Sequence, residues 1–532
     1  MAITKVLDQA LCLFMGFTTI YIASYVIFNL FFHPLRRFPG PLAMRATRAT
    51  YCYRLWRGRL SFDMLELHRR YGDVVRIAPD ELAFADPSAW KEIMGNHRTG
   101  GGGSGPKAAP EFDKADSFYR PLVELPRDII TANGPEHAML RRQLSPGFSE
   151  RSLREQEPVI MKYVDLFIQR MREATKGCQS RGHGDGDETV AGEKGNQSGP
   201  KQKQPVDLSL WYNYCTFDII GDLAFSESFG CLEDERLHPW VRTIFLMVRV
   251  GVALQTAGHF PVLRRLITVA LSTRAMRERM QKHQEMTMQK LTRRIELGER
   301  EGPRTDLIEA LLRKREDSGL SLKQIDANGS VVIIAGSETT ATLLSGVTYL
   351  LLKNPGKMRK LVREVRAAFG REEEINITSV NSLTYMLACL DEAMRIYPPV
   401  PTGLPRTVPE GGATILGEFV PQETTVSIHQ WAMYHNEKNF KNPFIFHPER
   451  FLGDPEYASD RREAFQPFHV GPRNCLGRSL AYIEMRIVLA RLLWNFDLTL
   501  AEDSHEWMET QKIYTIWEKG PLNVYLRPVA RG

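Results

Sequence analysis

The sequence predicts one large, mainly α-helical domain with small β-sheets behind an N-terminal transmembrane helix. Three observations predict it: a 23-residue uncharged stretch near the N-terminus, apolar residues at helical spacing through most of the chain, and short, scattered strand-like segments. The 532 residues are 43% hydrophobic with a net charge of +6, which is typical of a globular protein and excludes disorder of the whole chain. Seven cysteines are too few for a disulfide scaffold, and the charge is too small for a nucleic-acid-binding surface.

Residues 10–32 contain no charged side chain and predict an uncleaved transmembrane anchor. A helix of this length measures about 34 Å, enough to cross a hydrocarbon core of roughly 30 Å. The alternative, a cleaved signal peptide, has an apolar region of about 7–15 residues and a small-residue cleavage site, whereas this stretch ends in bulky side chains. One basic residue, Lys5, precedes the stretch closely, and four follow it: Arg36, Arg37, Arg45 and Arg48. The positive-inside rule therefore predicts that the main domain faces the cytosol.

The main domain is expected to span residues 42–532, after a stiff connector at 33–41 that contains three prolines. Ser321 and Gln324 form a capping-box pattern, and the helix that they begin cannot continue past Pro355. This helix, roughly 45 Å long, is apolar on most sides and is predicted to cross the middle of the domain.

The remaining elements are predicted from local patterns. Apolar spacing predicts further helices at 159–171, 211–225, 358–369 and 480–496. Strands are predicted at 74–77, 413–416, 424–428 and 523–526. Two segments are predicted to be loops because they lack large apolar side chains: a glycine-rich connector at 99–106 and a disordered insertion at 176–205.

Cys475 is the candidate for chemistry among the cysteines. It lies in a turn rich in glycine and proline, just before an apolar helix, where the helix dipole and free amides favour a thiolate. Arg473, two residues earlier, is a fixed cation that could pair with a carboxylate. A buried structural cysteine is the alternative, and Cys475 taken alone favours that alternative.

The residues around Cys475 match F-x-x-G-x-R-x-C-x-G, and this pattern resembles the heme-binding signature of the cytochrome P450 family. The resemblance extends from about residue 39 to 528 and is most similar to fungal members of secondary metabolism. One position departs from the family pattern, because His137 stands where the family has tryptophan. The matching motifs are Phe468, Gly471, Arg473, Cys475 and Gly477; the helix segment 335–340 (AGSETT); Glu392 with Arg395; 448–451 (PERF); and His137 with Arg141.

The resemblance implies a role for each of these residues. Cys475 would be the axial ligand of the iron of heme b. Arg473, Arg141, His137 and Arg406 would anchor the two heme propionates. On the long helix, Gly336 would make room for O₂, and Thr339 and Glu338 would relay protons. Three residues are expected to be structural, forming a buried triad that holds the loop behind the heme: Glu392, Arg395 and Arg450.

The resemblance also implies a monooxygenase of the endoplasmic reticulum membrane that hydroxylates or epoxidises an apolar terpenoid or polyketide. It would use O₂ and electrons from an NADPH–cytochrome P450 reductase, and it would bind no nucleic acid. One alternative is a heme-thiolate isomerase or dehydratase that needs neither O₂ nor reductase, and another is a non-catalytic heme-binding membrane protein. The Glu338–Thr339 pair argues against both, because neither alternative needs a proton relay.

Overall fold

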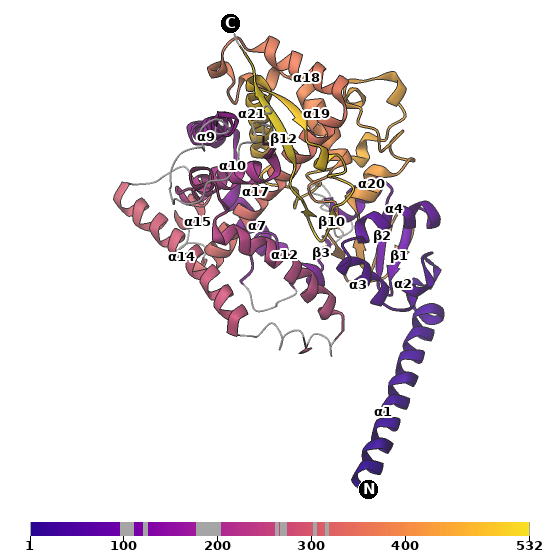
Figure 1. Ribbon diagram of the computed structural model, residues 1–532. Helices are drawn as coiled ribbons and strands as arrows, with labels where there is room; N and C mark the ends of the chain where they lie inside the picture. The colour runs from indigo at the N-terminus through magenta and orange to yellow at the C-terminus, as the bar shows by residue number, and fades with distance from the viewer. Residues whose placement is uncertain are drawn as a thin grey trace, which may run out of the picture.

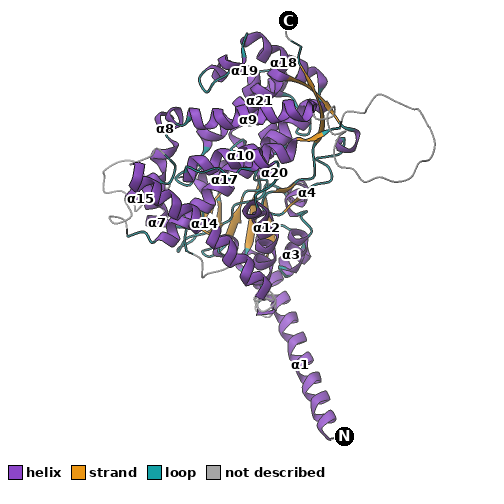
Figure 2. Cartoon of the chain, turned by 60° about the vertical axis from the view of Figure 1, so that its left-hand side comes forward, coloured by secondary structure: helices purple, strands orange, loops and turns teal. Residues whose placement is uncertain are grey.

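The computed structural model describes residues 2–95, 111–120, 126–176, 204–260, 265–266, 274–301, 306–313 and 319–530. One exposed helix, α1 (Ala2–Ile27), projects from a mainly helical body, and a small sheet lies at the end of the body where α1 is attached (Figure 1). The view turned by 60° gives the same arrangement (Figure 2). The predicted fold class is therefore confirmed. The connector expected at 99–106 and residues 177–203 of the expected insertion lie outside the described residues.

The helices of the body range from one turn to nearly nine turns. They are α2 (Leu42–Ala46), α3 (Ala49–Trp56), α4 (Leu60–Tyr71), α5 (Ser88–Met94), α6 (Asp116–Tyr119), α7 (Gly134–Leu144), α8 (Glu150–Glu155), α9 (Glu157–Lys176), α10 (Leu208–Phe225), α11 (Cys231–Asp234), α12 (Pro239–Gly258), α14 (Arg274–Glu301), α15 (Glu309–Arg313), α17 (Leu322–Lys353), α18 (Pro355–Ala368), α19 (Thr384–Ile396), α20 (Gln430–His435) and α21 (Arg478–Asn495).

Within the described residues the strands are short and form four small sheets. The largest has the order β1-β2-β8-β5-β3, and the others are β4-β12-β9, β10-β11 and β6-β7. All four strands expected from the sequence are present, as β1, β6, β8 and β12. The strands are β1 (Val74–Ala78), β2 (Glu81–Phe84), β3 (Asp113–Lys114), β4 (Val206–Asp207), β5 (Arg406–Thr407), β6 (Ala413–Ile415), β7 (Glu418–Val420), β8 (Thr425–Ser427), β9 (Phe496–Leu500), β10 (Lys512–Ile513), β11 (Trp517–Glu518) and β12 (Asn523–Pro528).

The segment Thr4–Phe32 is a candidate membrane anchor, with a mean hydropathy of 1.9 and none of its apolar window buried. Its last turn is tied to the body by hydrogen bonds. Asn29 Nδ2 donates to the carbonyl oxygen of Ala46 at 2.9 Å, and Arg76 Nη1 donates to the carbonyl oxygen of Asn29 at 2.9 Å. The connector that follows buries Leu35 and Phe38 in the smaller of two hydrophobic clusters. The end of the anchor is therefore fixed against the domain.

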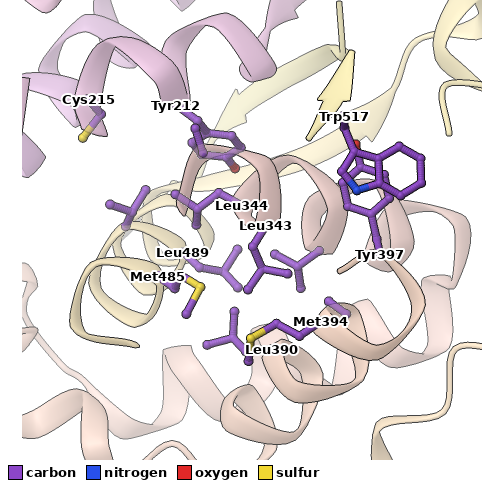
Figure 3. Close-up of a cluster of buried hydrophobic side chains, with 14 of the residues drawn as sticks. Tyr212, Cys215, Leu343, Leu344, Leu390, Met394, Tyr397, Met485, Leu489 and Trp517 are labelled. Atoms are coloured by element: carbon purple, nitrogen blue, oxygen red, sulfur yellow. The ribbon is translucent and has the colours of Figure 1, made fainter. Parts of the chain in front are cut away.

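Helix α17 passes through the larger hydrophobic cluster and organises the body. Ser321 and Gln324 form the expected capping box, and α17 ends one residue before Asn354, so that Pro355 begins α18. It packs most extensively against α10 and also contacts α19 and α21. Figure 3 shows this cluster, in which Leu343 and Leu344 of α17 lie among side chains of the neighbouring helices. A long apolar helix buried in this way is a core element rather than a second membrane span.

Candidate functional site

Cys475 lies in the turn that leads into α21. Its backbone N–H donates to the carbonyl oxygen of Phe468 at 2.8 Å, which closes the turn. Gly471 has φ +78°, and a Cβ atom there would lie 2.0 Å from the carbonyl oxygen of Met94, so the turn requires glycine at this position. The side chain of Cys475 is exposed, whereas those of Cys52, Cys215, Cys231 and Cys389 are buried. The structural-cysteine alternative therefore fits those four residues and not Cys475.

The electrostatics of Cys475 differ from the sequence expectation. Although the residue is exposed, burial of its thiol group raises the pKa of Cys475. The backbone N–H of Gly477 and the positive charges of Arg141 and Arg478 lower the pKa, but by less than burial raises it. The helix terminus alone therefore does not make Cys475 a thiolate. A bound metal cation would remove the proton, because a coordinating thiol is deprotonated.

The four residues expected to bind the cofactor's carboxylates come together around His137. His137 and Arg141 lie one turn apart on α7, Arg473 belongs to the cysteine turn, and Arg406 begins β5. The pKa of His137 is lowered to about 3, first by burial and then by the positive charges of Lys114, Arg473, Arg141 and Arg406. The imidazole is therefore neutral at physiological pH and lies among the basic side chains of these four residues.

Lys114 is a member of this cluster that the sequence did not reveal. It lies in β3 directly opposite Arg406 in β5, where a second positive charge would destabilise the sheet. Its Nζ donates to the carbonyl oxygens of Ile129 and Ala132, both at 2.9 Å. Burial, followed by Arg406 and Arg473, lowers the pKa of Lys114 to about 6. No local signal marks Lys114, because its position depends on the pairing of two strands far apart in the sequence.

The basic cluster formed by Lys114, Arg141, Arg406 and Arg473 favours an anionic ligand. Arg406 is 5% exposed, and its Nη1 has no hydrogen-bond partner among the described residues. Arg473 is partly compensated, with its Nε 2.8 Å from Glu111 Oε1. A buried guanidinium with an unpaired N–H group beside other cations suits a carboxylate ligand. The propionates of heme are such ligands, so the cluster and the exposed thiol together fit this cofactor.

Arg141 also has a local role in the cysteine turn. Its guanidinium donates to the backbone carbonyl oxygen of Asn474 at 2.6 Å and to the side-chain oxygen of the same residue. These two bonds join α7 to the residue that precedes Cys475. Arg141 therefore braces the turn in addition to contributing positive charge to the cluster.

Ala335 and Thr339 lie one turn apart on α17 and share an open face of the helix. Ala335 is exposed and Thr339 is half-buried, although most of the helix around them is buried. Thr339 Oγ1 donates to the carbonyl oxygen of Ala335 at 2.5 Å. A threonine hydroxyl bonded in this way competes with the backbone hydrogen bonds of the helix. The predicted hydroxyl therefore lies at a local weak point of α17, on its open face.

The role expected for Gly336 is wrong. A Cβ atom at this position would lie 2.8 Å from Cδ1 and 2.9 Å from Cγ1 of Ile220 on α10. The missing side chain therefore lets α10 approach α17 closely. The space is occupied by Ile220 and does not make room for O₂.

Glu338 is adjacent to Thr339 in the sequence but is held on a different side of α17. The side chain of Glu338 is 2% exposed, and its Oε1 contacts Lys519 Nζ and accepts a hydrogen bond from Thr342 Oγ1 at 3.2 Å. We expect Glu338 to link Thr339 to solvent; in the structure its carboxylate is buried and contacts the buried Lys519. The sequence did not reveal Lys519, because it lies far from Glu338 along the chain and in no recognisable motif.

Glu392, Arg395 and Arg450 form a buried network. Arg395 donates to both oxygens of Glu392, at 2.7 and 2.8 Å, and Arg450 Nε donates to Glu392 Oε1 at 3.0 Å. Asp460, which the sequence did not single out, accepts from Arg450 Nη1 at 2.5 Å. The network ties α19 to the segment 448–460, on the chain that leads to the cysteine turn.

Comparison with known proteins agrees with this arrangement. The family model described as cytochrome P450 matches residues 52–524. The cytochrome P450 monooxygenase prhB of Penicillium brasilianum is 45% identical over 508 residues, which is 96% of each chain. The cytochrome P450 monooxygenase tpeC of Talaromyces stipitatus is 44% identical over 525 residues, covering 98% of this chain and 94% of that one. The cytochrome P450 monooxygenase astA of Talaromyces wortmannii is 40% identical over 528 residues, covering 98% and 99%. This chain therefore belongs to the cytochrome P450 family and is a heme-containing P450 monooxygenase.

Proposed function

We propose that this protein hydroxylates or epoxidises an apolar secondary metabolite, a terpenoid or a polyketide, with electrons from an NADPH–cytochrome P450 reductase. One observation carries the proposal: the open face of α17 presents Thr339, and the adjacent residue is the acid Glu338. Monooxygenation needs protons delivered to the site of oxygen activation beside Thr339, whereas isomerisation and dehydration of a peroxide do not. When bound, heme supplies the oxygen chemistry, and Cys475 is the residue that would hold its iron.

The remaining site residues would bind and orient the cofactor. Arg406, with its unpaired Nη1, would neutralise the propionates together with Arg473 and Arg141, and Lys114 and His137 would donate hydrogen bonds to them. Glu392, Arg395 and Arg450 would keep the segment before the cysteine turn in place without contacting the reacting atoms.

An apolar substrate is supported by the segments that the family places around the substrate. Val400, Leu404, Tyr514 and Ile516 are half-buried rather than fully packed, and all four carry mainly apolar side chains. A pocket lined by such side chains favours an apolar ligand of the terpenoid or polyketide class.

The distribution of charge supports the proposed location and electron donor. Basic residues that follow the candidate anchor support an endoplasmic reticulum protein whose catalytic domain faces the cytosol. Arg478 of α21, three residues after Cys475, is exposed, and so is Arg142, which follows Arg141 on α7. Exposed cations at this place would steer an acidic reductase to the side of the molecule nearest the thiolate.

Isotope labelling with ¹⁸O₂ tests the proposed function. The substrate would first be identified as the metabolite that accumulates when the gene is deleted. Microsomes containing the protein, the reductase and NADPH should then convert it to a product that carries one ¹⁸O atom, the second atom leaving as water. Conversion without NADPH, or a product without ¹⁸O, would contradict the proposal and favour an isomerase or dehydratase. Heme-loaded protein that leaves this metabolite unchanged would favour the non-catalytic alternative.

A further inference from the structure

A buried lysine near the C-terminus holds the acid of the proposed proton relay. Lys519 Nζ contacts Glu338 Oε1 and donates to Thr342 Oγ1 at 2.6 Å, and Thr342 in turn donates to Glu338 Oε1. The side chains of Lys519 and Glu338 are 4% and 2% exposed. A buried ion pair needs such additional hydrogen bonds to offset the loss of water. The three groups form a closed network that fixes one oxygen of Glu338.

The neighbouring strand fixes Lys519 in position. Lys519 directly follows β11, and Trp517 of β11 donates from its Nε1 to the carbonyl oxygen of Pro398 at 2.7 Å. The indole of Trp517 stacks on Tyr397, with ring centroids 4.2 Å apart, and Figure 3 shows the two rings together at the edge of the core cluster. The carbonyl oxygen of Gly520, on the other side of Lys519, accepts from Trp507 Nε1 at 2.9 Å. The chain on both sides of the lysine is thus held by buried rings, at Trp517 and at Gly520.

Lys519 also lines a cavity of about 380 Å³ between the beginning of α10 and the segment 514–521. Arg249 and Glu518, which line the same cavity, form an exposed ion pair, so the cavity is in contact with solvent. Glu338 does not line the cavity. Lys519 therefore both lines this cavity and contacts Glu338.

The two oxygens of Glu338 differ in their surroundings. Oε1 is held by Lys519 and Thr342, whereas Oε2 is buried and has no hydrogen-bond partner among the described residues. Thr339 does not bond to either oxygen in this part of the chain, because its hydroxyl donates to the carbonyl oxygen of Ala335. The carboxylate is therefore attached through Oε1 to a residue that lines the solvent cavity, and Oε2 is left without a hydrogen bond.

We propose that Lys519 is a positioning residue that orients Glu338 between the solvent cavity and the open face of α17. Protons enter from water in the cavity and reach the face of Thr339 through Glu338. Each turnover takes O₂, two electrons from NADPH and two protons; one oxygen atom enters the substrate and the other leaves as water. When proton delivery is misdirected, the same two electrons and two protons leave as H₂O₂. This inference rests on the proposed function of Glu338 and Thr339 as a proton relay.

The test compares four variants of the heme-loaded, full-length protein: Lys519→Met, Lys519→Arg, Glu338→Gln, and Lys512→Met as a control on exposed β10. The readouts are product and H₂O₂ formed per NADPH, together with the carbon-monoxide spectrum. Lys519→Met should form product roughly tenfold more slowly. This is less than the roughly 10²–10⁴-fold that a positioned proton donor contributes to the rate, because Glu338 itself is still present. Its H₂O₂ yield should rise, its spectrum should be unchanged, and Lys519→Arg should restore most of the product. Lys512→Met should behave as the wild type.

A stability measurement separates positioning from misfolding. Lys519→Met leaves a buried unpaired carboxylate and should lower the urea midpoint, while the double variant Lys519→Met/Glu338→Gln should recover it. The double variant should still release H₂O₂, because the relay is absent. If Glu338→Gln diverts electrons to H₂O₂ and Lys519→Met does not, the role of Lys519 is overturned while the relay stands. If Glu338→Gln leaves the ratio of product to H₂O₂ formed per NADPH unchanged, the proposed relay is wrong, and the proposed role of Lys519 is wrong with it.

The route through the cavity has its own variant. Leu237 lines the cavity and is half-buried, so Leu237→Trp would fill part of it without altering Lys519 or Glu338. The variant should increase the solvent deuterium isotope effect on product formation and the H₂O₂ yield. An isotope effect and yield equal to those of the wild type would overturn this route.

Discussion

Glu484 of α21 should make the folded protein less stable as the pH rises. Its side chain is 1% exposed, and its Oε1 has no hydrogen-bond partner among the described residues. Burial raises the pKa of Glu484 from 4.5 to about 8, and a hydrogen bond with Thr340 only partly offsets the rise. The carboxyl group is thus neutral in the folded protein at pH 7 but ionised in the unfolded chain.

The sign and size of the effect follow from this difference in pKa. The contribution of Glu484 to stability is fully present below pH 4.5 and is lost as the pH rises through 8. Each unit of pH in this window removes about 1.4 kcal/mol, so the loss between pH 5 and pH 8 is about 4 kcal/mol. Glu484→Gln carries no charge at any pH, so its free energy of unfolding should lack this slope.

Urea unfolding of the heme-loaded, detergent-solubilised protein at pH 5, 6.5 and 8 measures the effect. Relative to the wild type, Glu484→Gln should gain stability steadily as the pH rises. Glu410→Gln, a matched change at an exposed glutamate, should follow the wild type at every pH. A Glu484→Gln variant whose stability falls with pH as steeply as the wild type would refute the reasoning.

Three further predictions concern the site. Glu392→Gln should lower the free energy of unfolding by about 3–5 kcal/mol, measured by urea titration, because it leaves two buried guanidiniums poorly paired; a loss below 1 kcal/mol would contradict the buried network. Arg406→Gln should release heme faster than the wild type, measured as the rate of heme transfer to apomyoglobin, since it removes a buried cation from the basic cluster that would bind the propionates. An unchanged rate would show that Arg406 does not hold the cofactor. Thr339→Ala should retain heme, seen by its absorbance, yet divert NADPH electrons to H₂O₂, with product falling about 10²-fold; tight coupling would contradict its role.

Local signals in the sequence were sufficient for much of the fold. The capping box at Ser321 and the proline at 355 both act within one helical turn, so the bounds of α17 could be predicted closely. The four predicted strands are runs of β-branched and apolar residues, and each is present. The two-residue strands β3 and β5 carry no such run and form only because the tertiary structure brings them together.

Site residues that belong to a sequence motif could be predicted. Site residues whose position depends on contacts between distant segments could not. The residues at positions 473 and 475 share one turn, and spacing alone places them together. Lys114 and Lys519 acquire their partners through strand register and helix packing, which no local pattern reports. The role of Gly336 could not be predicted for a related reason: the space beside its Cα is filled by Ile220 of α10, a distant segment of the chain.

The reduced carbon-monoxide spectrum tests the central claim, that Cys475 holds the heme iron as a thiolate. The wild-type protein should show the strongly red-shifted Soret band that a thiolate ligand produces. Cys475→Ala should lose this band, whereas Cys389→Ala, a change at a buried cysteine, should keep it. A wild-type protein that binds heme without the red-shifted band, or a Cys475→Ala variant that retains it, would contradict the account.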